Sequence, residues 1–247
     1  MPLNTKSGDI YLDVSRRLVR GLTPLHVYGY NGDVDASAET VWNAGSTYTF
    51  PAAALSSVTI VSGNSEDDTD KGGGTPGTGA WTAEIYGLDA NWAYQEETVS
   101  LDGTTPVAST KSWMRIFGCE ILTVGTGLTN AGNLTIADSG TTYAYVAAGL
   151  GESQGAIYTV PAGYNLHIRR VIASSSNTDT GIFVRYRPYG YGFRTEFQFT
   201  LTSSFISIDL DPPHSFGPQT DLEIRASSAT ANDIVTGQFF GILEDIS

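Results

Sequence analysis

Short runs of alternating hydrophobic and polar residues, each followed at once by a turn, recur from about residue 40 to the C-terminus. Residues 81–86 (WTAEIY) alternate in this way, residues 87–91 (GLDAN) carry turn residues, and a further run begins at residue 95. A period of two is typical of a half-buried strand, and Gly, Asp and Asn favour turns. The pattern therefore predicts an all-β chain and leaves no long run for a helix.

The expected strands are separated by turns and by no helical run, which is typical of a β-sandwich or jelly roll. The small, Gly-rich segment 138–155 marks a boundary between two groups of strands. We therefore expect an all-β fold with two antiparallel β-sandwich or jelly-roll-like domains, residues 21–145 and 146–247, behind an N-terminal arm, residues 1–20. Strands are expected at residues 26–30, 40–43, 48–50, 57–61, 81–86, 95–101, 111–122, 133–136, 156–160, 166–174, 181–189, 193–201, 205–210, 220–227 and 235–243.

The composition agrees with this class and narrows the possible partners. Of 247 residues only 16% are charged, the only lysines are Lys6, Lys71 and Lys111, and the net charge is −13. An acidic chain disfavours tight binding to nucleic acid or to an anionic membrane. No stretch approaches the ~20 apolar residues of a membrane span, and the first residues carry no apolar signal-peptide core. We therefore expect assembly in the cytoplasm, with no nucleic-acid or membrane partner.

Few residues have the pattern of a catalytic or metal site. His26, His167 and His214 have no companion at metal-ligand spacing and no nucleophile motif beside them. The Gly-rich run 72–79 lacks the Lys-Ser/Thr pair of a phosphate-binding loop and precedes a strand. The single cysteine, Cys119, lies in an apolar run, which indicates a buried structural thiol. We therefore expect no enzyme activity, no cofactor and no essential metal.

The acidic loop at residues 66–70 is a candidate for binding a cation. Glu66, Asp67, Asp68 and Asp70 supply carboxylates, which Ca²⁺ prefers as ligands. Their spacing does not fit an EF-hand, because the Gly and the distal Glu are missing at the required offsets. A solvated acidic loop is the favoured interpretation, and Ca²⁺ binding there stays open.

Two groups of residues are candidates for contacts with partner proteins. The first is Arg16, Arg17 and Arg20, the locally basic stretch of an acidic chain, which suits an arm that orders on its partner. The second combines arginines with aromatic rings, a composition enriched at protein interfaces. It comprises Arg185, Tyr186, Arg187, Tyr189, Tyr191 and Arg194. Core packing by strand alternation and a ligand site are alternative interpretations of this second group.

Several segments also resemble a family of tailed-phage virion proteins that is common in marine and environmental phages. The resemblance keeps order and spacing over about residues 19–165 and is looser beyond. It rests on residues 19–22 (VRGL), 41–45 (VWNAG), 48–51 (YTFP), 86–92 (YGLDANW), 97–107 (ETVSLDGTTPV), 131–136 (AGNLTI) and 154–163 (QGAIYTVPAG). These are strand-and-turn motifs, so they specify a fold and transfer no catalytic residue.

The resemblance implies a structural protein of the virion. It implies most directly a head decoration, or cement, protein that binds the major capsid protein lattice on the capsid surface and forms homotrimers at three-fold positions. Two alternatives stay open: a tail or head–tail structural protein, and a carbohydrate-binding receptor module that uses Trp81, Trp92 and residues 189–191. A hydrolase is a third alternative, for which the acidic residues show no partner arrangement.

Overall fold

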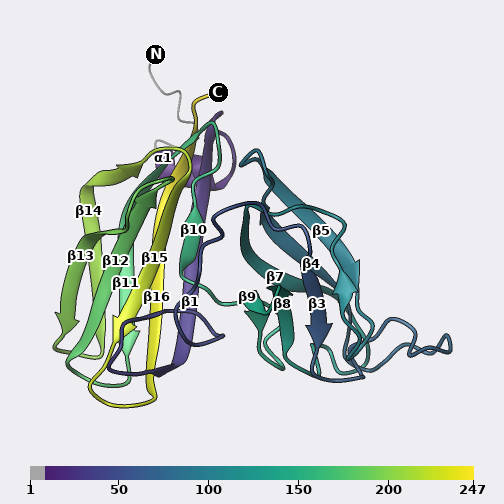
Figure 1. Cartoon of the computed structure of the whole chain (residues 1–247). Helices are drawn as coiled ribbons and strands as arrows, with labels where there is room; N and C mark the ends of the chain where they lie inside the picture. Colours follow the sequence, from purple (N-terminus) through teal and green to yellow (C-terminus); the bar gives the residue numbers. More distant parts are fainter. Residues whose placement is uncertain (1–8) are drawn as a thin grey trace.

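The computed structural model describes residues 9–247, and this part of the chain is all-β apart from one short helix (Figure 1). The helix, α1 (Ile10–Ser15), begins after Asp9, whose carboxylate accepts hydrogen bonds from the backbone N–H groups of Tyr11 and Leu12. The strands form small antiparallel sheets that are arranged as two lobes, each with its own hydrophobic core. No helix among the described residues is long and apolar enough to cross a membrane.

One lobe, which we call the terminal lobe, contains the first and the last strand of the chain. Its strands are β1 (Leu22–Val34), β2 (Glu39–Thr40), β10 (Ile157–Thr159), β11 (Tyr164–Ser175), β12 (Thr180–Pro188), β13 (Arg194–Leu201), β14 (Phe205–Phe216), β15 (Thr220–Ser227) and β16 (Asp233–Asp245). One sheet has the order β1–β16–β11–β14, and the other has the order β10–β15–β12–β13 with β2 added to β15. Both sheets contribute to one hydrophobic cluster, in which Ile182, Ile224 and Phe239 are fully buried.

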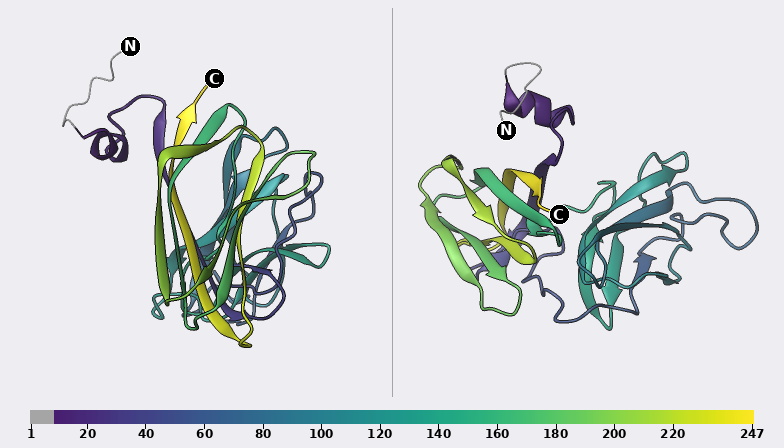
Figure 2. Two further views of the ribbon diagram at one scale, coloured as in Figure 1. Left: turned by 90° about the vertical axis from the view of Figure 1, so that its left-hand side faces the viewer. Right: turned by 90° about the horizontal axis from the view of Figure 1, so that it is seen from above.

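The other lobe, which we call the central lobe, lies beside the terminal lobe (Figure 2). Its strands are β3 (Thr59–Ser62), β4 (Ala80–Leu88), β5 (Tyr94–Ser100), β6 (Val107–Ala108), β7 (Arg115–Val124), β8 (Leu134–Asp138) and β9 (Thr141–Val146). They form sheets of order β6–β3–β8–β9 and β5–β4–β7. Alternation along β4 places Ala83 and Ile85 in the core, so Glu84 and Tyr86 lie on the outer face of the three-stranded sheet.

The central lobe is inserted into the terminal lobe between β2 and β10. β1 pairs with β16 from Leu22 opposite Glu244 to Asn31 opposite Val235, so the first and last strands lie side by side. The expected division at residues 21–145 and 146–247 put residues 22–34 in the first domain, whereas the structure pairs them with the last strand of the chain. Alternation marks a strand but does not name its partner, and a partner at the far end of the chain leaves no local signal.

Individual strands agree with the sequence to different degrees. The expected strands at residues 166–174 and 220–227 correspond closely to β11 and β15. β9 lies inside residues 138–155, which we expected to be a boundary segment, and it completes the sheet of the central lobe. Residues 48–50 form no strand, although Tyr48 and Phe50 pack in the core of the central lobe.

The described part of the expected arm packs against the terminal lobe. Val14 is buried, and the guanidinium carbon of Arg169 lies 3.7 Å from the centre of the Tyr11 ring. Opposite β16, the register of β11 shifts between Ile168 and Arg170, so Arg169 is the extra residue of a bulge, a device that redirects a side chain. Residues 1–8 of the expected arm lie outside the described residues.

Candidate functional site

A buried ion pair joins the two lobes. Arg115 of β7 and Asp221 of β15 have side chains that are 1% and 0% exposed, and they meet at Nε···Oδ1 2.8 Å and Nη2···Oδ2 3.0 Å. Thr159 donates to Asp221 Oδ1 at 2.7 Å, and Arg187 Nη2 donates to Asp221 Oδ2 at 2.6 Å. A carboxylate with this many donors can stay charged out of water. We call these four residues and the rings that enclose them the junction.

Two aromatic rings enclose the charged part of the junction. The guanidinium carbon of Arg115 lies 4.8 Å from the ring centre of Trp92 and 5.6 Å from that of Phe50. The ring of Tyr189 covers Trp92, with the two ring centres 4.7 Å apart. Rings over a guanidinium attract it and exclude water, so they strengthen the ion pair that fixes the lobes relative to each other.

Two arginines of the expected interface patch, Arg185 and Arg187, form ion pairs inside the chain. Arg187 Nη2 lies 2.6 Å from Asp221, and Arg185 Nη1 lies 3.3 Å from the buried carboxylate of Glu223. Arg225 Nε reaches the same Glu223 oxygen at 2.9 Å. Arg185 and Arg187, which alternate along β12, therefore form ion pairs with acidic residues of the neighbouring strand β15.

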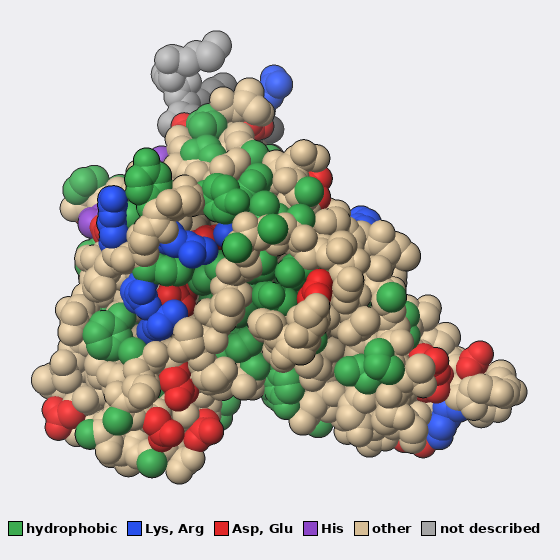
Figure 3. All heavy atoms as spheres, in the orientation of Figure 1, with side chains coloured by type: hydrophobic (Ala, Val, Ile, Leu, Met, Phe, Trp, Pro, Cys, Tyr) green, Lys and Arg blue, Asp and Glu red, His purple; other side chains and the backbone are tan. Residues whose placement is uncertain are grey.

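The remaining members of the patch divide into covered and exposed side chains. Tyr186 packs on Phe216 with ring centres 5.4 Å apart. Tyr189 packs on Trp92 of the junction but is still 43% exposed. Tyr191 is 65% exposed, and Arg194 is also exposed. Figure 3 shows Lys and Arg side chains gathered over the terminal lobe beside hydrophobic side chains. The role of these residues in a homotrimer stays a prediction.

The basic stretch lies at the end of α1 and in the loop that follows it. Arg16, Arg17 and Arg20 are all exposed. Arg17 adopts a positive φ of 56°, which reverses the chain after the helix. Their exposure leaves the three guanidinium groups available to a partner, and their role as an anchor stays a prediction.

The tryptophans proposed for carbohydrate binding do not present open faces. Trp92 is only 6% exposed, because Arg115 and Tyr189 occupy its ring. Trp81 is partly buried and donates its indole N–H to the carbonyl of Gly77 at 2.7 Å. A pyranose ring needs an accessible aromatic face for stacking, so Trp92 cannot serve as such a platform in this structure.

The carboxylates of the acidic loop bind donors from their own chain. Asp67 is fully buried and accepts hydrogen bonds from the backbone N–H groups of Ala80, Ala131 and Gly132 at 2.7 to 2.8 Å. It therefore ties three segments of the central lobe together. Among the described residues, no group of His, Cys, Asp and Glu side chains has the geometry of a metal site.

The three histidines lie on different strands and have different partners. His26 stacks on Phe240 with ring centres 4.3 Å apart, and His167 contacts Glu244 at 3.0 Å. His214 contacts Glu196. The expectation that Cys119 is a buried thiol is confirmed, and burial raises its pKa to about 12.

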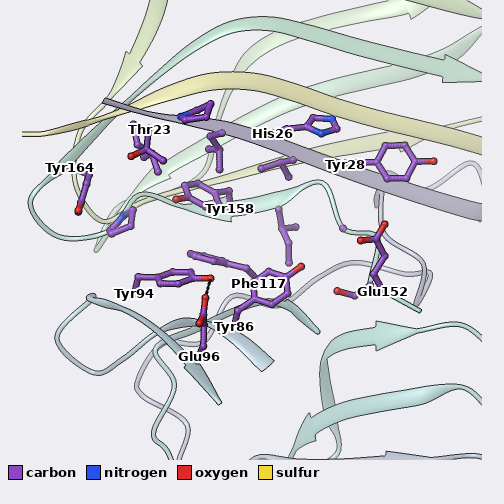
Figure 4. A pocket seen from close by; sticks show the side chains of 18 of the residues that line it. Thr23, His26, Tyr28, Tyr86, Tyr94, Glu96, Phe117, Glu152, Tyr158 and Tyr164 are labelled. Atoms are coloured by element: carbon purple, nitrogen blue, oxygen red, sulfur yellow. Dashed lines mark hydrogen bonds between the residues drawn. The ribbon is translucent and has the colours of Figure 1, made fainter. Parts of the chain in front are cut away.

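Beside the junction, an open cleft of about 740 Å³ lies between the lobes (Figure 4). Its walls are the outer face of β4, β5 and β7 on one side, and β1 and the start of β10 and β11 on the other. We call it the tyrosine cleft. Its aromatic residues are Tyr28, Tyr86, Tyr94, Phe117, Tyr158 and Tyr164.

Strand register explains how the central lobe supplies its part of the lining. Tyr86 of β4 is paired with Glu96 of β5, and Tyr94 lies two residues from Glu96, so the three side chains share one face of the sheet. The Tyr94 hydroxyl donates to Glu96 Oε1 at 2.8 Å. Tyr94 is 55% exposed and belongs to neither hydrophobic core.

A bulge directs Phe117 into the same cleft. Tyr86 is opposite Gly118 and Gly87 is opposite Ile116, so Phe117 has no partner residue on β4. Ile116 packs in the central core, and the extra residue therefore points to the outer face. The Phe117 ring stacks on Tyr158 of the terminal lobe with centres 4.6 Å apart, so the base of the cleft joins both lobes.

Two phenols of the cleft, Tyr86 and Tyr94, have raised pKa values. Burial raises the pKa of Tyr86 to about 12, against the opposing effect of a hydrogen bond with Ser153. Burial and the hydrogen bond with Glu96 raise the pKa of Tyr94. Neutral phenols both donate and accept hydrogen bonds, so the cleft offers polar groups of both kinds along its aromatic walls.

Reasoning from the sequence did not find this cleft. Tyr86, Tyr94 and Tyr158 occur in strand or turn segments that were interpreted only as parts of the fold. The alternation of Tyr94 with Glu96 was a detectable signal of a shared face. No local pattern indicates that this face meets the terminal lobe, because the contact joins segments that are distant in the chain, Phe117 of β7 and Tyr158 of β10.

Comparisons with known proteins do not identify a family. No family model and no curated protein matches the chain. Among solved structures, the infectious bursal disease virus Gx strain gives a TM-score of 0.21 at 10% identity, covering 92% of this chain and 77% of that chain. The VP2 subviral particle of the same virus gives a TM-score of 0.19 at 9% identity, covering 91% and 72%. TM-scores this low do not establish a shared fold.

Proposed function

We propose that this protein is a non-enzymatic structural component of a tailed-phage virion. In its finer form, the proposal is a decoration protein that binds the major capsid protein lattice from the outside and stabilises the head. The proposal places the protein on the capsid surface of particles assembled in the host cytoplasm.

The strand order of the terminal lobe is the observation that carries the proposal. Apart from the two-residue β2, its strands in chain order are β1 and β10 to β16, eight in all. One sheet contains the first, eighth, third and sixth of these, and the other contains the second, seventh, fourth and fifth. This order supports a jelly roll, an architecture of two Greek keys that occurs in viral capsid and lectin domains. We infer a jelly roll for the terminal lobe and a β-sandwich for the central lobe.

A fold of this kind hosts many functions, so a second observation is needed. Segments that resemble the phage virion family meet at the junction. Phe50, Trp92 and Thr159, each from a different such segment, contact the Arg115–Asp221 pair. The resemblance thus covers residues that hold the two lobes as one rigid body. A protein that bridges neighbouring capsid subunits needs such a body, because flexible lobes would not hold the subunits at a fixed spacing.

We further propose a homotrimer that uses the exposed part of the patch, Tyr191 and Arg194. Aromatic and arginine side chains anchor interfaces, and closed symmetry lets one patch serve every subunit. Arg16, Arg17 and Arg20 would then contact the capsid lattice. Light scattering after size exclusion measures the mass against the 26.3 kDa protomer. A monomer at micromolar concentration would contradict the trimer in free solution.

Cryo-electron microscopy of intact particles tests the position in the virion. Density for the two lobes on the outer head surface is the expected result. Density on the tail or at the head–tail connection would favour the alternative structural role, and absence from the particle would overturn the proposal. Purified protein added to heads that lack it should raise their disruption temperature, and the change Arg16→Ala, Arg17→Ala and Arg20→Ala should reduce its occupancy.

A further inference from the structure

We propose that the tyrosine cleft is a binding site for a neutral oligosaccharide. The inference does not depend on the place of the protein in a virion, because it rests on the lining of the cleft alone. It also differs from the receptor module considered from the sequence, whose Trp92 is buried in the junction.

The cleft has the dimensions and the rigidity of a ligand site. Its volume of about 740 Å³ falls within the roughly 300–1,000 Å³ of typical ligand sites. Its two walls come from different lobes, and the buried Arg115–Asp221 pair holds these lobes in place. The stacked rings of Phe117 and Tyr158 close the base between them. A site whose walls are already positioned loses little entropy when a ligand binds.

The lining matches the two kinds of surface that a sugar presents. Pyranose rings have apolar C–H faces, which pack on exposed aromatic rings such as Tyr94, and hydroxyl groups around their edges. The carboxylates of Glu96 and Glu152 and the hydroxyls of the tyrosines can accept or exchange hydrogen bonds with those groups. The existing bond from the Tyr94 hydroxyl to Glu96 holds the ring and the carboxylate in a fixed relation.

The charges of the cleft lining favour a neutral sugar over charged ligands. The charged residues of the lining are Glu96, Glu152 and Arg17, with His26 near the rim. Two carboxylates disfavour phosphate and nucleic acid, while Arg17 and the small net charge give little attraction for a strongly cationic peptide. An apolar peptide would cover the carboxylates and tyrosine hydroxyls of the lining without offering them hydrogen-bond partners in place of water, which costs free energy. A neutral polyhydroxylated ligand meets none of these penalties.

A panel of neutral hexasaccharides, including maltohexaose, cellohexaose, chitohexaose and mannohexaose, tests the proposal by isothermal titration with the full chain. An arginine-rich hexapeptide and a sulfated hexasaccharide serve as charged comparisons. We expect at least one neutral sugar to bind and both charged probes to fail. Binding of the peptide alone, or of no neutral sugar in the panel, would overturn the proposal.

Variants then locate the site. Tyr94→Ala removes the stacking surface and should weaken binding about tenfold, the effect of losing one aromatic contact. Tyr94→Phe keeps the ring and should lose less. Phe205→Ala is the matched control, because Phe205 is also 55% exposed but lies on β14 away from the cleft. Unchanged melting of all three variants excludes unfolding, and binding that survives Tyr94→Ala would place the sugar elsewhere.

Discussion

The junction and the tyrosine cleft lie next to each other between the same two lobes, yet they are built in opposite ways. At the junction, Arg115 and Asp221 are fully buried and every polar group shown there has a partner. In the cleft, Phe117 and Tyr158 stack between the lobes, whereas Tyr94 is 55% exposed and belongs to neither core. The buried ion pair and this stacked pair both link the lobes, which leaves the exposed wall of the cleft free for another role.

The choice of an ion pair at the junction also has a physical consequence. Burying two charges offsets most of the energy that their attraction supplies, so such a pair adds little net stability. It does impose geometry, because the planar guanidinium binds the carboxylate of Asp221 through two parallel bonds. The ion pair therefore also fixes the distance between the walls of the cleft, because each wall belongs to a different lobe.

The largest effect on stability is expected from a substitution that breaks the ion pair of the junction. Arg115→Ala leaves Asp221 buried with part of its donors missing and should lower the free energy of unfolding by about 3–5 kcal/mol. Urea denaturation measures the loss and also shows whether the lobes begin to unfold separately. The control is Arg170→Ala, whose ion pair with Asp209 is exposed to solvent and should contribute little to stability. Equal losses in the two variants would mean that the junction is not the link between the lobes.

Removing an uncharged aromatic ring from the junction tests the same contrast between the junction and the cleft. Trp92 is buried against Arg115, Leu88 and Met114, so Trp92→Ala should cost about 3 kcal/mol through the cavity that it leaves. Thermal unfolding monitored by circular dichroism gives the shift in melting temperature. A loss below about 1 kcal/mol would show that the structure relaxes into the cavity.

At alkaline pH, the stability of the protein should depend on the phenol of Tyr86 in the cleft. The pKa of Tyr86 is raised to about 12, so the folded protein holds this proton more tightly than the unfolded chain. The resulting stability is present below the unfolded pKa of ~10 and is lost as the pH rises toward about 12. Tyr86→Phe should therefore flatten part of the decline in unfolding free energy above pH ~10. An unchanged decline would show that Tyr86 does not contribute to it.

The smallest effect on stability is expected from a substitution in the cleft. Tyr94→Ala removes an exposed ring that belongs to neither core, so the free energy of unfolding should change by less than about 0.5 kcal/mol. Chemical denaturation alongside Trp92→Ala makes the comparison direct. If Tyr94→Ala destabilised the protein as much as Trp92→Ala, the cleft would be part of the structural link between the lobes.

Some features of the fold follow directly from local pattern. Alternation predicts β11 and β15 closely, and the apolar run around Cys119 correctly predicts a buried thiol. The arginines of β12 were predicted to be interface residues, which stays a prediction, whereas their carboxylate partners on β15 were not predicted. Complementary charge on a neighbouring strand is invisible until the strand order is known.

The sequence by itself determined that the chain is all-β, where most of its strands run and which residues are apolar enough for the two cores. Only the tertiary structure decided that β1 pairs with β16, that the central lobe is an insertion and that Phe117 leaves the core at a bulge. The physical reason is the distance along the chain over which each kind of interaction acts. Alternation and turn chemistry act between neighbouring residues, whereas the junction and the cleft arise where segments distant in sequence meet and exclude or admit water.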